Sequence, residues 1–151
     1  MTPDERKARL KEQYANDRAE YTKSINEYIN RLADIKEFVN CETFFHSKRQ
    51  DIVEKKHEYM DLTLTMMSAI NRRKTAVLES ILDNPQKNFS IKSKDERMIL
   101  VDGDANILML QESLDLLNNQ IMFLNDTQKT IEGIIYNMKY RFEVQKYMGV
   151  C

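Results

Sequence analysis

The chain has 151 residues, of which 42% are hydrophobic and 31% charged, and its net charge is −1 at neutral pH. Its length fits one domain, and three glycines and two prolines leave few places for turns, so residues 1–151 are expected to form a single, nearly all-helical domain. No apolar run reaches the ~18 residues of a membrane span. We expect a cytoplasmic protein without a membrane partner. A reduced cytosol favours free thiols at Cys41 and Cys151, and a disulfide between them is the open alternative.

The first predicted helix runs from about residue 3 to residue 39. Pro3 suits a first helical turn, where its missing N–H costs nothing. Apolar residues recur at heptad spacing along one face of this segment: Tyr14, Tyr21, Ile25, Tyr28, Leu32, Ile35 and Val39. The repeat is disturbed over residues 40–46 without any glycine or proline, which predicts a turn or a loosened helix there.

A second, basic helix is predicted over residues 47–82, with Ser47 as its cap. Asp83-Asn84-Pro85 ends it, because the residue before a proline avoids helical geometry. Residues 83–94 then form a polar, basic loop with a single aromatic, Phe89.

The last predicted helix covers residues 94–148, and Ser93 with Glu96 forms a capping box at its start. Gly103 and Gly133 are the expected bends, although an isolated helical glycine is often tolerated. A seven-residue apolar repeat follows this helix and is interrupted only by Gln128. Its members are Ile107, Leu110, Leu114, Leu117, Ile121, Leu124, Ile131, Ile135, Met138 and Phe142.

Such a repeat needs partner helices, and the mostly uncharged positions beside it favour packing of several helices over a two-stranded coil. We therefore predict a homo-oligomer. The predicted subunit contacts are Ile107, Leu114, Leu117, Ile121, Leu124, Ile135, Met138 and Phe142. Gln128 is the position expected to set register or subunit number.

The chain lacks the sequence patterns of catalysis. It has no phosphate-binding glycine loop, no nucleophile elbow and no cysteine and histidine cluster at metal spacing. The two histidines, His46 and His57, lie too far apart along a helix to share one metal ion. We expect no enzyme, no metal and no cofactor.

Charge is segregated along the chain. Residues 46–74 carry seven lysines and arginines against four carboxylates, whereas residues 98–127 carry five carboxylates and no lysine or arginine. The run Arg72-Arg73-Lys74, extended by Lys87 and Lys92 of the loop, is the candidate nucleic-acid site, because adjacent cations can meet a phosphate backbone. The alternative is an ordinary solvated helix face. The run from Lys139 to Phe142 also mixes cations with aromatics, and a structural role is expected for it.

Several of these residues keep the mutual spacing of a known family. They are Ile81-Leu82-Asp83, Phe89-Ser90, Asp104, Ile107-Leu108, Leu114, Ile121, Met138-Lys139 and Tyr147. In this pattern the chain resembles the UvsY recombination mediators of T-even-type bacteriophages, over about residues 47–149. In that family a Lys-Ala-Arg motif followed by Leu-Asp-Tyr-Tyr contacts single-stranded DNA. Here Arg72 and Lys74 stand at the two charged positions, whereas Arg73 replaces the alanine and residues 75–78 replace the rest.

The resemblance implies a ring of six or seven subunits, held together by the C-terminal helices, in the cytoplasm of the phage's host cell. It implies binding of single-stranded DNA, displacement of single-strand binding protein and loading of the phage recombinase, during recombination, repair and recombination-dependent replication. Two other interpretations stay open. One is a scaffolding coiled-coil protein of a virion or assembly complex; the other is a helical adaptor that docks a partner along Met109, Leu116 and Phe123.

Overall fold

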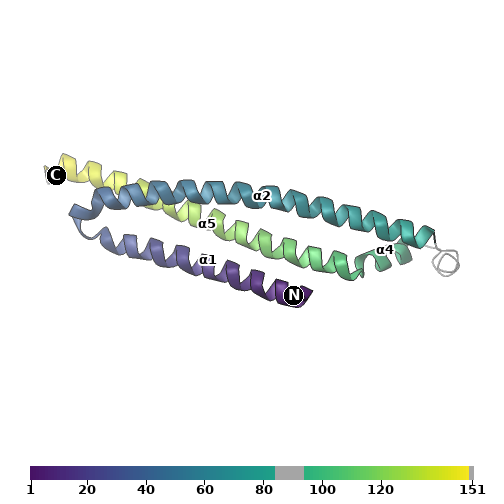
Figure 1. The fold of residues 1–151 in the computed structure, drawn as a ribbon. Helices are drawn as coiled ribbons and strands as arrows, with labels where there is room; N and C mark the ends of the chain where they lie inside the picture. Colours follow the sequence, from purple (N-terminus) through teal and green to yellow (C-terminus); the bar gives the residue numbers. More distant parts are fainter. Residues whose placement is uncertain (84–93, 150–151) are drawn as a thin grey trace.

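The computed structural model describes residues 1–83 and 94–149 of the chain. In these ranges the chain forms α1 (Pro3–Arg31), the short 3-10 helix η1 (Ile35–Glu37), α2 (Phe38–Leu82), α4 (Lys94–Asp102) and α5 (Ala105–Tyr147). Neither range contains a strand, so the predicted all-α fold is confirmed. The long helices α2 and α5 run side by side in opposite directions, and α1 covers only the part of this pair that lies away from α4 (Figure 1).

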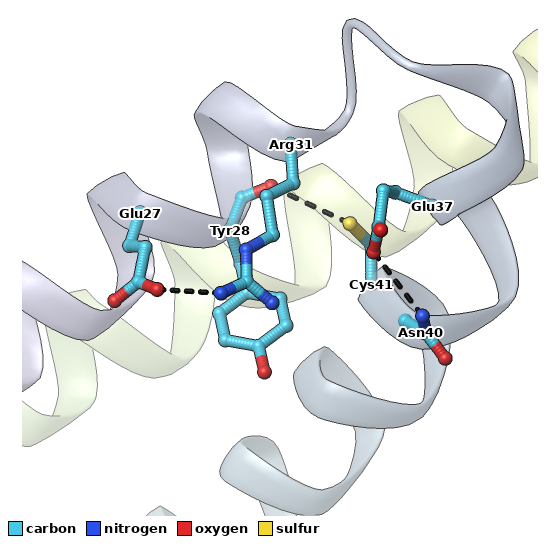
Figure 2. Close-up of polar contacts among 6 residues, drawn as sticks. All are labelled: Glu27, Tyr28, Arg31, Glu37, Asn40 and Cys41. Atoms are coloured by element: carbon cyan, nitrogen blue, oxygen red, sulfur yellow. Dashed lines mark hydrogen bonds and ion pairs between the residues drawn. The ribbon is translucent and has the colours of Figure 1, made fainter.

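Helix α1 ends eight residues earlier than predicted, at Arg31 instead of residue 39. Asp34 stops the chain from continuing as α-helix, because its carboxylate accepts a hydrogen bond from the N–H of Lys36 at 3.0 Å and caps η1. The reversal brings Cys41 back onto α1, where its thiol donates to the carbonyl of Tyr28 at 3.5 Å. Figure 2 shows this contact across the turn, with Arg31 over the ring of Tyr28.

The predicted break at residues 40–46 is wrong, because α2 runs through it without interruption for 45 residues. Cys41 and Phe45, one helical turn apart, are both fully buried. Ile52 and Tyr59 continue the same buried face at heptad spacing. The aromatic residues that disturb the repeat in the sequence therefore belong to the helix core.

The predicted last helix is divided at Gly103, as expected for one of its two glycines. Helix α4 ends at Asp102, and Asp104 caps α5 by accepting a hydrogen bond from the N–H of Ile107 at 3.1 Å. A Cβ at Gly103 would lie 3.3 Å from the carbonyl oxygen of Ile99, closer than a side chain prefers. The second glycine, Gly133, lies inside α5 with open space around it and causes no break.

The apolar repeat of the last helix is used inside the chain. Leu117, Leu124, Ile131 and Met138 pack against α1 and α2 in the main core cluster. Ile107 and Leu114 pack against Ile70 and Val101 in a second cluster, between α2, α4 and α5. These contacts satisfy the helix neighbours that the repeat requires.

The predicted subunit contacts are corrected accordingly. Five of the eight are buried within one chain and cannot reach another subunit: Ile107, Leu114, Leu117, Leu124 and Met138. Ile121 and Ile135 are half-buried against the main cluster. Phe142 is 45% exposed, with its ring stacked on Phe38 at 5.7 Å, and it remains a predicted subunit contact with Ile121 and Ile135.

The stripe proposed to dock a partner helix, formed by Met109, Leu116 and Phe123, is also largely covered by other parts of the same chain. Leu116 and Phe123 pack against the main core, and the ring of Phe123 lies 6.3 Å from that of Tyr21 on α1. Helix α1 therefore occupies the place that a partner helix would need.

Gln128, the polar interruption of the repeat, joins α2 to α5. Its carbonyl oxygen accepts a hydrogen bond from Lys56 Nζ at 2.9 Å, and its amide donates to Glu132 Oε1 at 2.9 Å. Glu132 also accepts from Arg49 Nε at 3.0 Å. A polar residue within an apolar repeat restricts the register of helix pairing, and here that register is one between two helices of the same chain.

Candidate nucleic-acid interface

Most cations of the basic segment 46–74 are engaged within the chain. Arg49 pairs with Glu132, Lys55 lies 3.4 Å from a carboxylate oxygen of Glu58, and Lys56 donates to Gln128. Lys48 lies over the rings of Tyr21 and Phe44, at 5.3 and 5.6 Å from their centroids. The excess of positive charge in the sequence is therefore largely used to join α2 to α1 and α5.

Arg73, the centre of the predicted cationic run, is engaged as well. Its Nε and Nη2 donate to the two carboxylate oxygens of Asp104, both at 3.1 Å. This bidentate pair is geometrically specific, and Asp104 is at the same time the cap of α5. Arg73 is thus a structural residue that holds the start of α5 against α2, which corrects its assignment as a DNA contact.

The pair perturbs both ionisation equilibria. The hydrogen bond from Arg73 holds the pKa of Asp104 below its ordinary value, and the N–H of Ile107 contributes in the same direction. The same hydrogen bond raises the pKa of Arg73. Both shifts favour the charged forms that the ion pair needs.

The Asp104 carboxylate should make stability depend on acid pH. Because its pKa is lower in the folded than in the unfolded chain, the pair stabilises the fold at neutral pH, and this contribution is lost as pH falls from about 4 through the lowered pKa. Asp104→Asn keeps a capping oxygen but removes the charge. We expect the variant to be less stable than the wild type at neutral pH and equal to it in strong acid, in thermal unfolding followed by circular dichroism.

Subtracting the variant's pH profile from that of the wild type isolates Asp104, because Glu132, whose pKa is also lowered by its hydrogen bonds to Gln128 and Arg49, contributes to both proteins. Parallel profiles for the two proteins would show that the ion pair adds nothing to stability.

Arg72 and Lys74 differ from the rest of the basic segment. The side chain of Arg72 is exposed and that of Lys74 half-exposed, and neither has a hydrogen bond or ion pair to any residue in 1–83 or 94–149. Two residues apart on α2, they project roughly 200° from each other. The structure therefore leaves both free for a polyanion but does not bring them onto one face.

The two other residues of the predicted site, Lys87 and Lys92, lie outside the described part of the chain, as does the aromatic of the same segment, Phe89.

Exposed tyrosines at the other end of the molecule were not predicted as functional residues. Tyr136, Tyr140 and Tyr147 are 70%, 63% and 94% exposed on α5. The expected structural role of the run from Lys139 to Phe142 holds for Phe142, which stacks on Phe38, and for Arg141, which donates to the carbonyl of Leu32 at 3.0 Å. Tyr140 takes no part in this packing. In the sequence, this exposed surface is indicated by the mixture of lysines and tyrosines in residues 139–147.

Metal chemistry finds no support in residues 1–83 and 94–149, which contain no group of three or more histidine, cysteine or carboxylate side chains able to hold an ion. His46 and Glu42 lie on one exposed helix face, 4.0 Å apart. Cys41, the described cysteine, is buried, and burial raises the pKa of its thiol, which disfavours a reactive thiolate.

Comparison with protein-family models, with curated proteins and with solved structures finds no match to this chain. Among the described helices, none is both long enough and apolar enough to cross a membrane.

Proposed function

We propose that the protein is a non-enzymatic recombination mediator that binds single-stranded DNA. In this proposal it promotes loading of a phage recombinase onto DNA covered by single-strand binding protein, in the host-cell cytoplasm, during recombination, repair and recombination-dependent replication. One observation carries the proposal. Of the seven cations in residues 46–74, five contact other side chains within the described residues. The two without such contacts there, Arg72 and Lys74, are those that match the charged positions of the mediators' DNA-contact motif.

Assembly into a homo-oligomer would increase the affinity for DNA that this small site provides. Two cations per chain give weak, salt-sensitive binding to a phosphate backbone. A homo-oligomer of six or seven subunits would repeat the pair, so that one strand binds several subunits and gains affinity through effective concentration. Because the strand is held by its phosphates at this site, the bases beside Arg72 and Lys74 remain accessible to a recombinase.

Subunit contacts in such an oligomer would use apolar side chains that remain exposed on the single chain. Val39, Met60, Leu64 and Met67 of α2 are 69%, 50%, 64% and 49% exposed. Near Val39, a cavity of about 410 Å³ also reaches Ile135 and Phe142, two of the remaining predicted subunit contacts. Exposed apolar surface of this kind is typical of interaction sites.

Replacing Arg72 and Lys74 together by alanine should weaken binding to oligo-dT and reduce its salt dependence. Each lost phosphate contact removes about 0.7 from the slope of log affinity against log salt for single strands, so the slope should fall by about 0.7 for each of the two cations that contacts the bound strand. Fluorescence anisotropy with a labelled oligo-dT over a series of salt concentrations measures both quantities.

The matched control is Arg9→Ala with Lys23→Ala, which removes two exposed cations from α1 and changes net charge by the same amount. It should leave the slope unchanged. Equal slopes for the wild type and the Arg72 and Lys74 variant would contradict the assigned contacts. Light scattering should give one oligomer mass for all three proteins.

The alternative is a scaffolding coiled-coil protein of a virion or assembly complex without DNA binding. The engagement of five of the seven cations within the chain favours it, since these residues then serve the fold alone. A wild-type protein that forms a large oligomer but binds no oligo-dT at any salt concentration would support this alternative against the mediator.

A further inference from the structure

Three tyrosines and a lysine form one exposed stripe along the C-terminal half of α5. Lys129, Tyr136, Tyr140 and Tyr147 follow one another at intervals of seven, four and seven residues, which places them on one side of the helix. All four are exposed, and the tyrosines keep between 63% and 94% of their surface in contact with solvent. We call these four residues the tyrosine stripe.

The tyrosine stripe takes no part in the packing of the part of the chain that the structure describes. The other four tyrosines, Tyr14, Tyr21, Tyr28 and Tyr59, pack in or against the main core. By contrast, Tyr136, Tyr140 and Tyr147 make no hydrogen bond or ring contact with any residue of 1–83 or 94–149. Gly133, on the same helix one turn before Tyr136, adds no side chain that would cover the rings.

The charge around the rings is suited to an anion. Residues 129–147 contain four cations, Lys129, Lys139, Arg141 and Lys146, against two carboxylates, Glu132 and Glu143. Glu132 is already paired with Arg49. The three lysines are exposed or near the surface and have no ion pair within the described residues. The surface therefore combines flat, accessible rings with a local excess of positive charge.

We propose that the tyrosine stripe is a second binding site for single-stranded DNA, in which unpaired bases stack on Tyr136 and Tyr140 while Lys129 and Lys139 meet the phosphates. Rings beside cations are the arrangement that binds single strands, because every base has a face that can stack. A duplex hides these faces within its own stack, so the site selects single strands. The inference rests on the proposed DNA-binding function and adds a base-contacting surface to it.

The two sites are well separated on the chain. Arg73 pairs with Asp104, so Arg72 and Lys74 lie near the start of α5. Tyr136 follows about 30 residues later on the same helix, a distance of roughly 45 Å. Within the described residues the first site offers the charges of Arg72 and Lys74, whereas the tyrosine stripe offers charge together with aromatic rings. Contacts at the two sites should therefore be separable by mutation.

The test compares oligo-dT binding by the full chain with that of Tyr136→Ala/Tyr140→Ala. At about fivefold for each lost stacking partner, affinity should fall roughly 25-fold. Tyr136→Phe/Tyr140→Phe keeps both rings and should bind like the wild type. Met122→Ala, which truncates another exposed side chain of α5, is the matched control and should also bind normally.

A photo-crosslinking oligonucleotide with iodouracil in place of thymine locates the contact directly. Crosslinks to the peptide that holds Tyr136 and Tyr140, with affinity lost in the alanine variant and kept in the phenylalanine variant, would establish the site. Normal affinity of the alanine variant, with crosslinks only near Arg72, would refute the tyrosine stripe and leave the proposed function intact. A fall in oligomer mass on the Tyr→Ala changes would identify the stripe as a contact between copies of the chain. A wild-type protein that binds no oligo-dT would overturn both proposals.

Discussion

Replacing Leu124 by alanine is expected to lower the free energy of unfolding by about 2–5 kcal/mol. Leu124 is fully buried in the main core cluster, where residues of α1, α2 and α5 surround it. Truncation removes its transfer free energy and leaves a cavity that three packed helices can close only in part. Urea denaturation followed by far-ultraviolet circular dichroism measures the change.

Met122→Ala supplies the control for Leu124→Ala, because Met122 lies two residues away on α5 and is 62% exposed. Its truncation should change stability by no more than about 0.5 kcal/mol. Light scattering distinguishes the two possible roles of the apolar repeat. If Leu124 packs within one chain, its variant loses stability but keeps its oligomer mass. Loss of the oligomer with unchanged stability would show instead that Leu124 belongs to a subunit contact.

The apolar repeat shows which structural features a sequence pattern predicts and which it does not. The spacing of Leu117, Leu124 and Ile131 correctly predicted a helix with one continuously buried face, since period and apolar character are local properties. The pattern does not state which helix covers that face. A covering helix from the same chain and one from another subunit would produce the same apolar pattern. Here the helices that cover the face, α1 and α2, belong to the same chain.

The candidate site, too, could be predicted only in part from the sequence. Counting charges identified the basic segment and the run Arg72-Arg73-Lys74, but it could not identify which cations are neutralised. Arg73 pairs with Asp104, which lies 31 residues away, and Arg49 pairs with Glu132, 83 residues away. Only the tertiary fold brings such partners together. For the same reason, the exposure of Tyr140 beside the buried Met138 follows from the orientation of α5 and not from composition.

The turn between α1 and α2 was placed about eight residues too late because the sequence around it contains no glycine or proline. The disturbed repeat at residues 40–46 predicts a turn or a loosened helix, whereas α2 is continuous there. Asp34, a good capping residue whose carboxylate accepts from the N–H of Lys36, was the better indicator. The turn therefore lies at this cap and not at the interruption of the heptads.

Thr43→Pro tests this difference between sequence and structure. Thr43 is exposed and lies in the second turn of α2, where its N–H is expected to bond the carbonyl of Val39. Proline removes this donor, and its ring clashes with the same carbonyl, so the variant should lose about 3 kcal/mol or more of stability. A chain that turned at residues 40–46 would accommodate the proline with little loss.

Thr43→Ala is the control, since alanine removes the same side chain but favours the helix, and its stability should remain within about 0.5 kcal/mol of the wild type. Equal melting curves for the proline and alanine variants would show that α2 is interrupted near Thr43. The burial of Cys41 and Phe45 on one face predicts the opposite, because a kink at residue 43 would move one of them out of the core. The proline variant should therefore also lose the packing of Phe45 on Tyr28, whose rings lie 6.4 Å apart, and hence the attachment of α1 to α2.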